Sequence, residues 1–265
     1  MKDNFIHVAF IIDESGSMSG SEKDIIGGFN KTIEEQKMVE NGQCAVSFFS
    51  FSDTVNERFI GKDVSEVNEL YESGLSARFS WILKGLPTGD ETSAIKDTSA
   101  IKDTSDKDPL YGYAPGGCTA MNDAIGSAID KIGKWLCDMP EEERPSKNLI
   151  VIMTDGMENA SKEYTLNKVK DMIQHQTEKY NWSFVYMGMD ITTKEAADNL
   201  GISGRSFSSK ASSSLHKNYS NISNSATCYR MSSALDASAN MDAYLSSELA
   251  YDTATYEHEI GKKIK

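Results

Sequence analysis

The chain has 265 residues and a formal net charge of −13, because 40 acidic side chains outnumber 27 basic ones. This length is enough for one large α/β domain or two small ones. The acidic balance argues against nucleic acid and against an anionic membrane surface as partners, since both attract basic proteins. The longest apolar runs, residues 8–12 and 149–153, are too short to span a bilayer.

The N-terminal residues and the cysteines both indicate a reducing compartment. Residues 1–8 contain no apolar signal-peptide segment and continue directly into a predicted strand. The cysteines at positions 44, 118, 137 and 228 show no Cys-x-x-Cys spacing. We therefore expect reduced, mostly buried thiols in a cytoplasmic protein, rather than a zinc site or a disulfide framework.

Strands and amphipathic helices alternate through the first two thirds of the sequence. The predicted strands are residues 5–12, 45–51, 54–60, 149–153 and 183–189. A first helix is predicted to begin near Ser21. Further helices are predicted over residues 119–135, 166–179, 193–200 and 215–229. The strands are apolar with little alternation, which is typical of a sheet covered on both faces. This order predicts a doubly wound, mostly parallel α/β sheet with helices on both faces.

Two of these helices carry distinct local signals. Residues 21–24 resemble a capping box that begins the first helix. The last helix is predicted from apolar residues at alternating spacings of four and three, which would pack it on the domain. These residues are Leu215, Tyr219, Ile222, Ala226 and Tyr229.

Two segments depart from the strand–helix pattern. Residues 92–103 contain the string Thr-Ser-Ala-Ile-Lys-Asp twice, and a period of six fits neither a heptad nor a strand. We interpret this duplication as part of a solvent-exposed, low-complexity loop at about 85–114. The predicted organisation is one domain over residues 1–235 and a C-terminal tail or short helix over 236–265, where Tyr244, Leu245 and Leu249 could form a second short helix.

Hydroxyl and carboxylate side chains follow the ends of two predicted strands. Asp13, Ser15 and Ser17 follow the first strand, and Asp155 follows the strand at 149–153. Thr119 comes after a Gly-Gly pair, at the start of a predicted helix. Ligands of an open parallel sheet bind outside the carboxyl ends of its strands, so these residues should meet at one edge. Oxygen donors of this kind suit a hard cation, and we predict Mg²⁺, with Mn²⁺ as the alternative ion.

Together these five residues resemble the metal-ion-dependent adhesion site of von Willebrand factor A (vWA) domains. The matching pattern is Asp-x-Ser-x-Ser after the first strand, followed by a threonine and an aspartate on later segments. More narrowly, residues 10–18 and 154–161 resemble the bacterial and phage stand-alone members of this family. The resemblance covers about residues 5–200 well.

The resemblance implies a Rossmann-like vWA fold with Mg²⁺ at the upper edge of its sheet. It implies that Ser15, Ser17 and Thr119 contact the metal directly, whereas Asp13 and Asp155 often hold it through water. In this family, a partner protein typically supplies an aspartate or glutamate to the open coordination position. An alternative is that Asp13 and Ser17 only cap the helix that follows them.

Other polar residues near the motifs are not expected to bind the metal. Glu14 and Glu158 are expected to be solvated charges at the rim of the site. Asp190 follows the strand at 183–189 and is expected to cap a helix or lie at the rim. His7 falls inside the first strand and should be a core or sheet-face residue.

We therefore expect a metal-dependent protein-binding module, and not an enzyme, in which a divalent cation captures a carboxylate of a partner protein. A structural or assembly component, for example of a phage particle, is the alternative. A metal-dependent hydrolase is a weaker alternative, because the motifs supply no separate general base or nucleophile beside the candidate ligands. No nucleic-acid or membrane partner is expected.

Overall fold

The computed structural model describes residues 1–73, 107–155, 157–188, 193–202, 206–208 and 212–231. These residues contain a six-stranded sheet in the order β3-β2-β1-β6-β7-β8, in which only β3 is antiparallel to its neighbour. The strands are β1 (Lys2–Asp13), β2 (Gln43–Phe51), β3 (Val55–Asp63), β6 (Pro145–Thr154), β7 (Ser183–Gly188) and β8 (Ser206–Ser208). The predicted mostly parallel sheet is confirmed.

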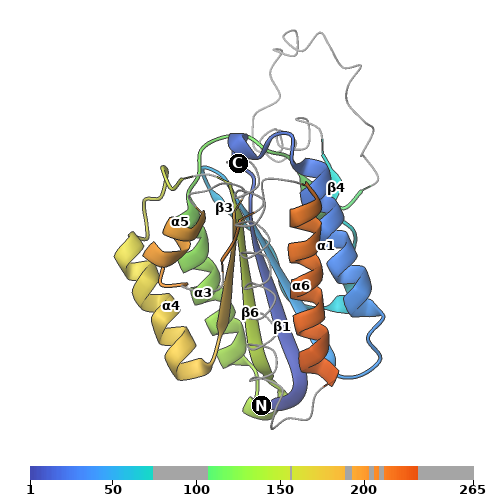
Figure 1. Cartoon of the computed structure of the whole chain (residues 1–265). Helices are drawn as coiled ribbons and strands as arrows, with labels where there is room; N and C mark the ends of the chain where they lie inside the picture. The colour runs from blue at the N-terminus through green and yellow to red at the C-terminus, as the bar shows by residue number, and fades with distance from the viewer. Residues whose placement is uncertain (74–106, 156, 189–192, 203–205, 209–211, 232–265) are drawn as a thin grey trace, which may run out of the picture.

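Helices cover both faces of this sheet (Figure 1). One face carries α1 (Glu22–Lys37) and α6 (Ser212–Met231). The other face carries α3 (Met121–Asp138), α4 (Leu166–Tyr180) and α5 (Thr193–Asn199). The chain is therefore doubly wound, as the alternation of predicted strands and helices indicated.

The central strands explain why their sequences lack alternation. Val8, Phe10 and Ile12 of β1 pack towards α1 and α6, whereas Ala9 and Ile11 pack towards the opposite helices. All five side chains are at most 2% exposed. Full burial of a large apolar side chain contributes about 1.5–3 kcal/mol, so both faces of this strand stabilise the fold.

The last helix, α6, is held to α1 by apolar and polar contacts. All of the predicted stripe residues of α6 are buried. Gly28 of α1 leaves room for the ring of Tyr219, which a Cβ at position 28 would meet at 2.0 Å. At the other end of the interface, Gln36 Nε2 donates to the carbonyl oxygen of Ser223 at 2.8 Å. Arg230 Nη1 donates to the carbonyl oxygen of Gln36 at 2.6 Å, which satisfies the C-terminal end of α1.

Helix α1 begins where it was expected, but the predicted capping box is absent from its first turn. Ser21 is the N-cap residue, but its side chain makes no capping hydrogen bond. The backbone N–H groups of Asp24 and Ile25 instead donate to the Ser21 carbonyl oxygen, both at 3.1 Å. The side chain of Glu22 turns outward from the helix and accepts from the Gly20 N–H at 2.8 Å.

The end of the predicted low-complexity loop contributes to the core. A short 3₁₀ turn, η3 (Pro109–Tyr111), leads into β5 (Gly112–Tyr113), which pairs in parallel with β4 (Tyr71–Glu72). Tyr111 and Tyr113 are both buried. The duplicated residues 92–103 and the predicted tail at 236–265 lie outside the described residues.

The cysteines agree only in part with the prediction. All four cysteines are reduced, but Cys118 and Cys137 are exposed rather than buried. Burial raises the pKa of the Cys44 thiol to about 12, so this group stays protonated. No helix within the described part of the chain is both long and apolar enough to cross a membrane.

Candidate metal site

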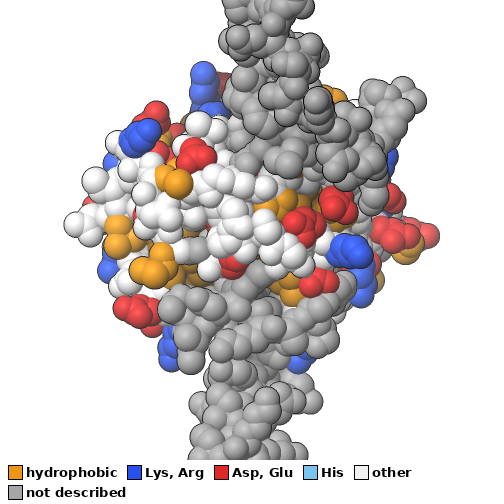
Figure 2. All heavy atoms as spheres, turned by 90° about the horizontal axis from the view of Figure 1, so that it is seen from above, with side chains coloured by type: hydrophobic (Ala, Val, Ile, Leu, Met, Phe, Trp, Pro, Cys, Tyr) orange, Lys and Arg blue, Asp and Glu red, His pale blue; other side chains and the backbone are white. Residues whose placement is uncertain are grey.

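The predicted ligands gather at the carboxyl ends of β1 and β6, which are parallel neighbours in the sheet. Asp13 is the last residue of β1, and Asp155 directly follows β6. Ser17 lies in a short 3₁₀ turn, η1 (Gly16–Met18), between β1 and α1. Thr119 precedes α3. Figure 2 views this end of the molecule, where acidic side chains stand among uncharged surface atoms.

Asp13 is completely buried, and hydrogen bonds to both its carboxylate and its backbone carbonyl oxygen hold it in place. Its Oδ1 accepts from the Ser15 N–H at 2.6 Å, and its Oδ2 accepts from the Thr154 hydroxyl at 2.6 Å. Its carbonyl oxygen accepts from the Tyr113 hydroxyl at 2.8 Å. Burial raises the pKa of the Asp13 carboxyl, and the charge of Asp155 acts weakly in the same direction, whereas hydrogen bonds from Thr154 and Ser15 lower it. A nearby cation would favour the charged form of this carboxylate.

A chain of oxygen atoms connects the first strand to Asp155. The Ser15 and Ser17 hydroxyl oxygens lie 3.0 Å apart, and the Ser17 hydroxyl donates to Asp155 Oδ1 at 2.7 Å. Octahedral Mg²⁺ binds oxygens at about 2.1 Å, which places adjacent ligand atoms about 3 Å apart. The spacing of these hydroxyls therefore fits a shared cation. Ser17 is exposed to solvent, whereas Ser15 is buried.

Thr119 is held by its backbone. Its N–H donates to Asn159 Oδ1 at 2.9 Å, and its carbonyl oxygen accepts from the N–H groups of Asn159 and Ala160 at 3.0 and 3.2 Å. Gly117, with a φ of +89°, accepts a hydrogen bond from the Gly16 N–H at 3.0 Å. This hydrogen bond joins the loop before Thr119 to the loop that carries Ser15 and Ser17. The other four predicted ligands are connected to one another by hydrogen bonds of their side chains or backbone.

Glu158 is not a solvated rim charge, so that expectation was wrong. Its carboxylate accepts from the N–H groups of Asn122, Ala160 and Ser161 at 2.7, 3.0 and 2.8 Å. It also accepts from the Ser161 hydroxyl at 2.8 Å. Because Asn122 lies in the first turn of α3, the carboxylate also interacts with the positive end of that helix. Glu158 therefore ties the segment after Asp155 to α3.

Glu14 is not a solvated rim charge either, because it is 3% exposed and forms an ion pair with Arg58. Arg58 Nη2 lies 3.1 and 3.0 Å from its two carboxylate oxygens. The Nε of Arg58 donates to Ser50 Oγ at 2.8 Å, and the Glu14 carbonyl oxygen accepts from the Gly116 N–H at 2.7 Å. The pair fixes the loop that presents the two serines. Asp190 lies outside the described residues.

Sequence reasoning missed four residues that orient the predicted ligands. Thr154 and Asn159 lie within the segment that resembles the family, so their positions carried a signal. Arg58 and Tyr113 carried none, since each reaches the site only through the folded structure.

The donor set has the character of a site for a hard cation. No group of three or more His, Cys, Asp or Glu side chains able to hold a metal occurs in the described ranges. The predicted set is of another kind, because it combines hydroxyls with two carboxylates. Mg²⁺ prefers such oxygen ligands and keeps several waters. The residues present therefore fit Mg²⁺ in chemistry and, for the serines, in spacing.

No protein-family model and no curated protein sequence matches this chain. Solved structures do match it. Proximal thread matrix protein 1 from the mussel byssus has a TM-score of 0.51 at 13% identity, covering 86% of this chain. This chain spans about half of that protein, at 48% of its length. The vWF domain of the type V pili tip protein Mfa5 from Porphyromonas gingivalis has a TM-score of 0.51 at 10% identity. That match covers 83% of this chain and 94% of the other. Together with the sheet order, these matches show that the chain has a vWA-like fold.

Proposed function

We propose that this protein is a metal-dependent protein-binding module that captures a carboxylate of a partner protein. The observation that carries the proposal is the run of oxygen atoms from buried Asp13 through Ser15 and exposed Ser17 to Asp155. These four residues and Thr119 would hold Mg²⁺, with Mn²⁺ as the alternative ion. When bound, the ion supplies an electrophilic centre that accepts an oxygen of an incoming aspartate or glutamate.

The chain's own residues support capture rather than a closed structural site. The hydroxyls of Ser15 and Ser17 are neutral, so they leave more positive charge on a bound ion than carboxylates would. The exposed position of Ser17 gives a partner access from solvent. With a net charge of −13, the protein should favour a partner that is not strongly acidic outside its docking carboxylate.

We propose binding rather than catalysis because the nearby carboxylates are already engaged. Glu158 accepts bonds from the α3 terminus and its own loop, and Glu14 pairs with Arg58. Neither is placed as a free general base for a metal-dependent hydrolase. A role as an assembly component is the second candidate. It is favoured by the two structural neighbours, one a byssus matrix protein and the other a pilus-tip protein, and it is compatible with carboxylate capture.

The first test measures Mg²⁺ binding by titration calorimetry. We expect Asp155→Ala and Ser17→Ala to weaken Mg²⁺ binding at least tenfold. Ser19→Ala is the matched control, because Ser19 is an exposed serine of the same loop and belongs to no predicted ligand set. Equal Mg²⁺ affinity in all four proteins would contradict the proposed site.

The second test concerns the partner. The protein, immobilised with Mg²⁺ or with EDTA, is exposed to an extract of its native source, and bands that differ between the two are identified. We expect a specific partner to be retained with Mg²⁺ by the wild type and lost with Asp13→Ala. Retention that is unaffected by EDTA would rule out capture through a metal.

A further inference from the structure

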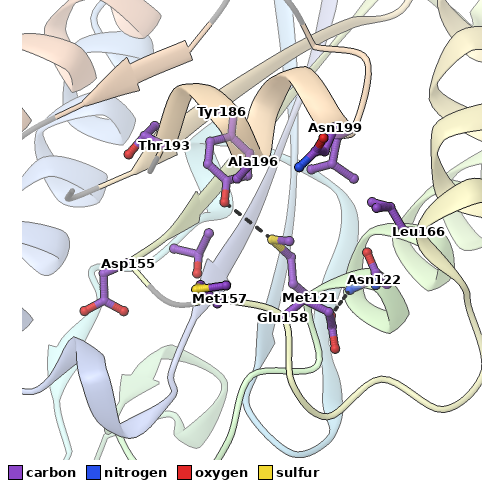
Figure 3. Close-up of a pocket in the computed structure, with 12 residues that line it drawn as sticks. Met121, Asn122, Asp155, Met157, Glu158, Leu166, Tyr186, Thr193, Ala196 and Asn199 are labelled. Carbon is purple, nitrogen blue, oxygen red and sulfur yellow. Dashed lines mark hydrogen bonds between the residues drawn. The ribbon is translucent and has the colours of Figure 1, made fainter. Parts of the chain in front are cut away.

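A pocket of about 200 Å³ opens beside the candidate metal site. It lies between the start of α3, the ends of β6 and β7, and α5 (Figure 3). Thr154 and Asp155 line this pocket and also belong to the polar network of the metal site. Figure 3 shows Asp155 towards one end and Leu166 towards the other, with Met157 and Met121 between them.

The surface of the pocket is mainly apolar. Its floor includes Met121 and Tyr186, which are buried, and the Tyr186 hydroxyl points at the Met121 sulfur at 3.6 Å. This contact turns the tyrosine hydroxyl away from solvent. Met157 and Leu166 are 76% and 38% exposed, so two large apolar side chains stand at the mouth. A bound apolar group would remove this surface from water.

Charge and size restrict what this pocket accepts. Asp155 and Glu158 border it, so a second anion is repelled. A hydrated cation is disfavoured by the apolar floor. At about 200 Å³ the pocket is smaller than typical small-molecule sites of about 300–1,000 Å³. The occupant that remains is one apolar side chain of leucine, methionine or phenylalanine size.

We propose that this pocket binds an apolar side chain of the partner protein, next in sequence to the carboxylate captured at the metal site. The inference rests on the proposed function, because the shared residues Thr154 and Asp155 place one end of the pocket beside the captured carboxylate. The partner is thereby recognised through an acidic residue with an apolar neighbour, and the pocket supplies selectivity that the metal alone lacks.

The test uses four capped dipeptides with Mg²⁺: acetyl-Glu-Leu-amide, acetyl-Leu-Glu-amide and the two serine counterparts. Binding is followed by NMR of ¹³C-labelled methionine methyl groups, which report on Met121 and Met157. We expect one leucine dipeptide to bind at least tenfold more tightly than its serine counterpart and to shift both methyl signals.

Two variants separate the pocket from the metal site. Ala196→Phe fills the pocket and should remove the leucine preference while keeping Mg²⁺ and serine-dipeptide affinity. Met157→Ser, at an exposed position, should reduce the preference with little effect on folding. Glu195→Phe is the control, because Glu195 is exposed on the same helix, α5, and does not line the pocket.

The outcomes distinguish the two proposals. Equal binding of leucine and serine dipeptides with Mg²⁺ would overturn the proposed role of the pocket but not the proposed capture of a carboxylate. Absence of Mg²⁺-dependent binding by any dipeptide overturns both. A leucine preference that persists in EDTA disconnects the pocket from the metal site and overturns the inference as stated.

Discussion

The burial of His7 predicts that the stability of the fold depends on pH. It is fully buried in β1, and its ring centroid lies 4.9 Å from that of Trp135 on α3. Its Nδ1 lies 3.0 Å from Asn148 Oδ1, and its Nε2 lies 2.7 Å from Ser47 Oγ. The carbonyl acceptor on Asn148 assigns the proton to Nδ1, so that Nε2 accepts from the Ser47 hydroxyl. Burial lowers the pKa of His7 to about 4, although the bond to Asn148 acts in the opposite direction.

The size of the effect follows from this difference. The pKa of His7 is 6.5 in the unfolded chain and about 4 in the folded one. Between these values the unfolded state binds more protons, so the free energy of unfolding rises with pH. At about 1.4 kcal/mol per pKa unit, this shift corresponds to about 3 kcal/mol in the free energy of unfolding. That contribution is present above pH 6.5 and is lost on acidification. About 2 kcal/mol of it is lost by pH 5, and the loss is complete somewhat below pH 4.

The assay is urea unfolding of the wild type and His7→Gln between pH 4 and 8. Carboxyl groups titrate in both proteins, so the difference between their unfolding free energies isolates His7. We expect this difference to fall by about 3 kcal/mol from pH 7.5 to pH 4. His175→Gln, at an exposed position on α4, is the control for replacing a histidine outside the core. Parallel profiles for the wild type and His7→Gln would refute the reasoning.

Gly28→Ala should lower the free energy of unfolding by about 1–3 kcal/mol, because its Cβ meets the Tyr219 ring at 2.0 Å. Gly133→Ala, whose Cβ would lie in open space, should raise the free energy of unfolding by up to about 1 kcal/mol. If urea unfolding ranked the two variants the other way, the packing of α6 on α1 would be disproved. Asn159→Ala removes the acceptor of the Thr119 N–H at the candidate metal site, and should weaken Mg²⁺ binding about tenfold in calorimetry. Asp123→Ala is the control, because Asp123 accepts from the N–H groups of Lys162 and Tyr164, farther along the same loop, and its loss should leave Mg²⁺ affinity unchanged. Equal losses of Mg²⁺ affinity in the two variants would show that Asn159 only stabilises the loop.

The fold class was predictable because it depends on local patterns. β1 is apolar from residue 8 to 12 on both faces, and such runs occur where helices cover both sides of a sheet. The start of α1 was predictable in place but not in chemistry. Ser21 can satisfy the first helical N–H groups with its hydroxyl or with its carbonyl oxygen, and the sequence does not distinguish these.

The surroundings of the candidate site were less predictable, because their partners are distant in sequence. Glu14 pairs with Arg58, 44 residues away, and Glu158 accepts from the Asn122 N–H, 36 residues away. A charged residue without a visible partner is expected to be solvated, since burying it alone is costly. Only the folded chain brings the compensating donors to these carboxylates.

The topology gives a physical reason for the place of the site. Sheet order runs from β1 to β2 and β3 on one side and from β6 to β7 and β8 on the other. After β1 the chain leaves to α1 on one face, and after β6 it leads to α4 on the opposite face. The two loops diverge, and a crevice forms at such a switch point in open α/β sheets. Asp13 and Asp155 stand on its two sides, joined through Ser15 and Ser17. A cation bound there would be reachable from solvent without any change in the sheet, and the adjoining pocket is lined by residues of α5.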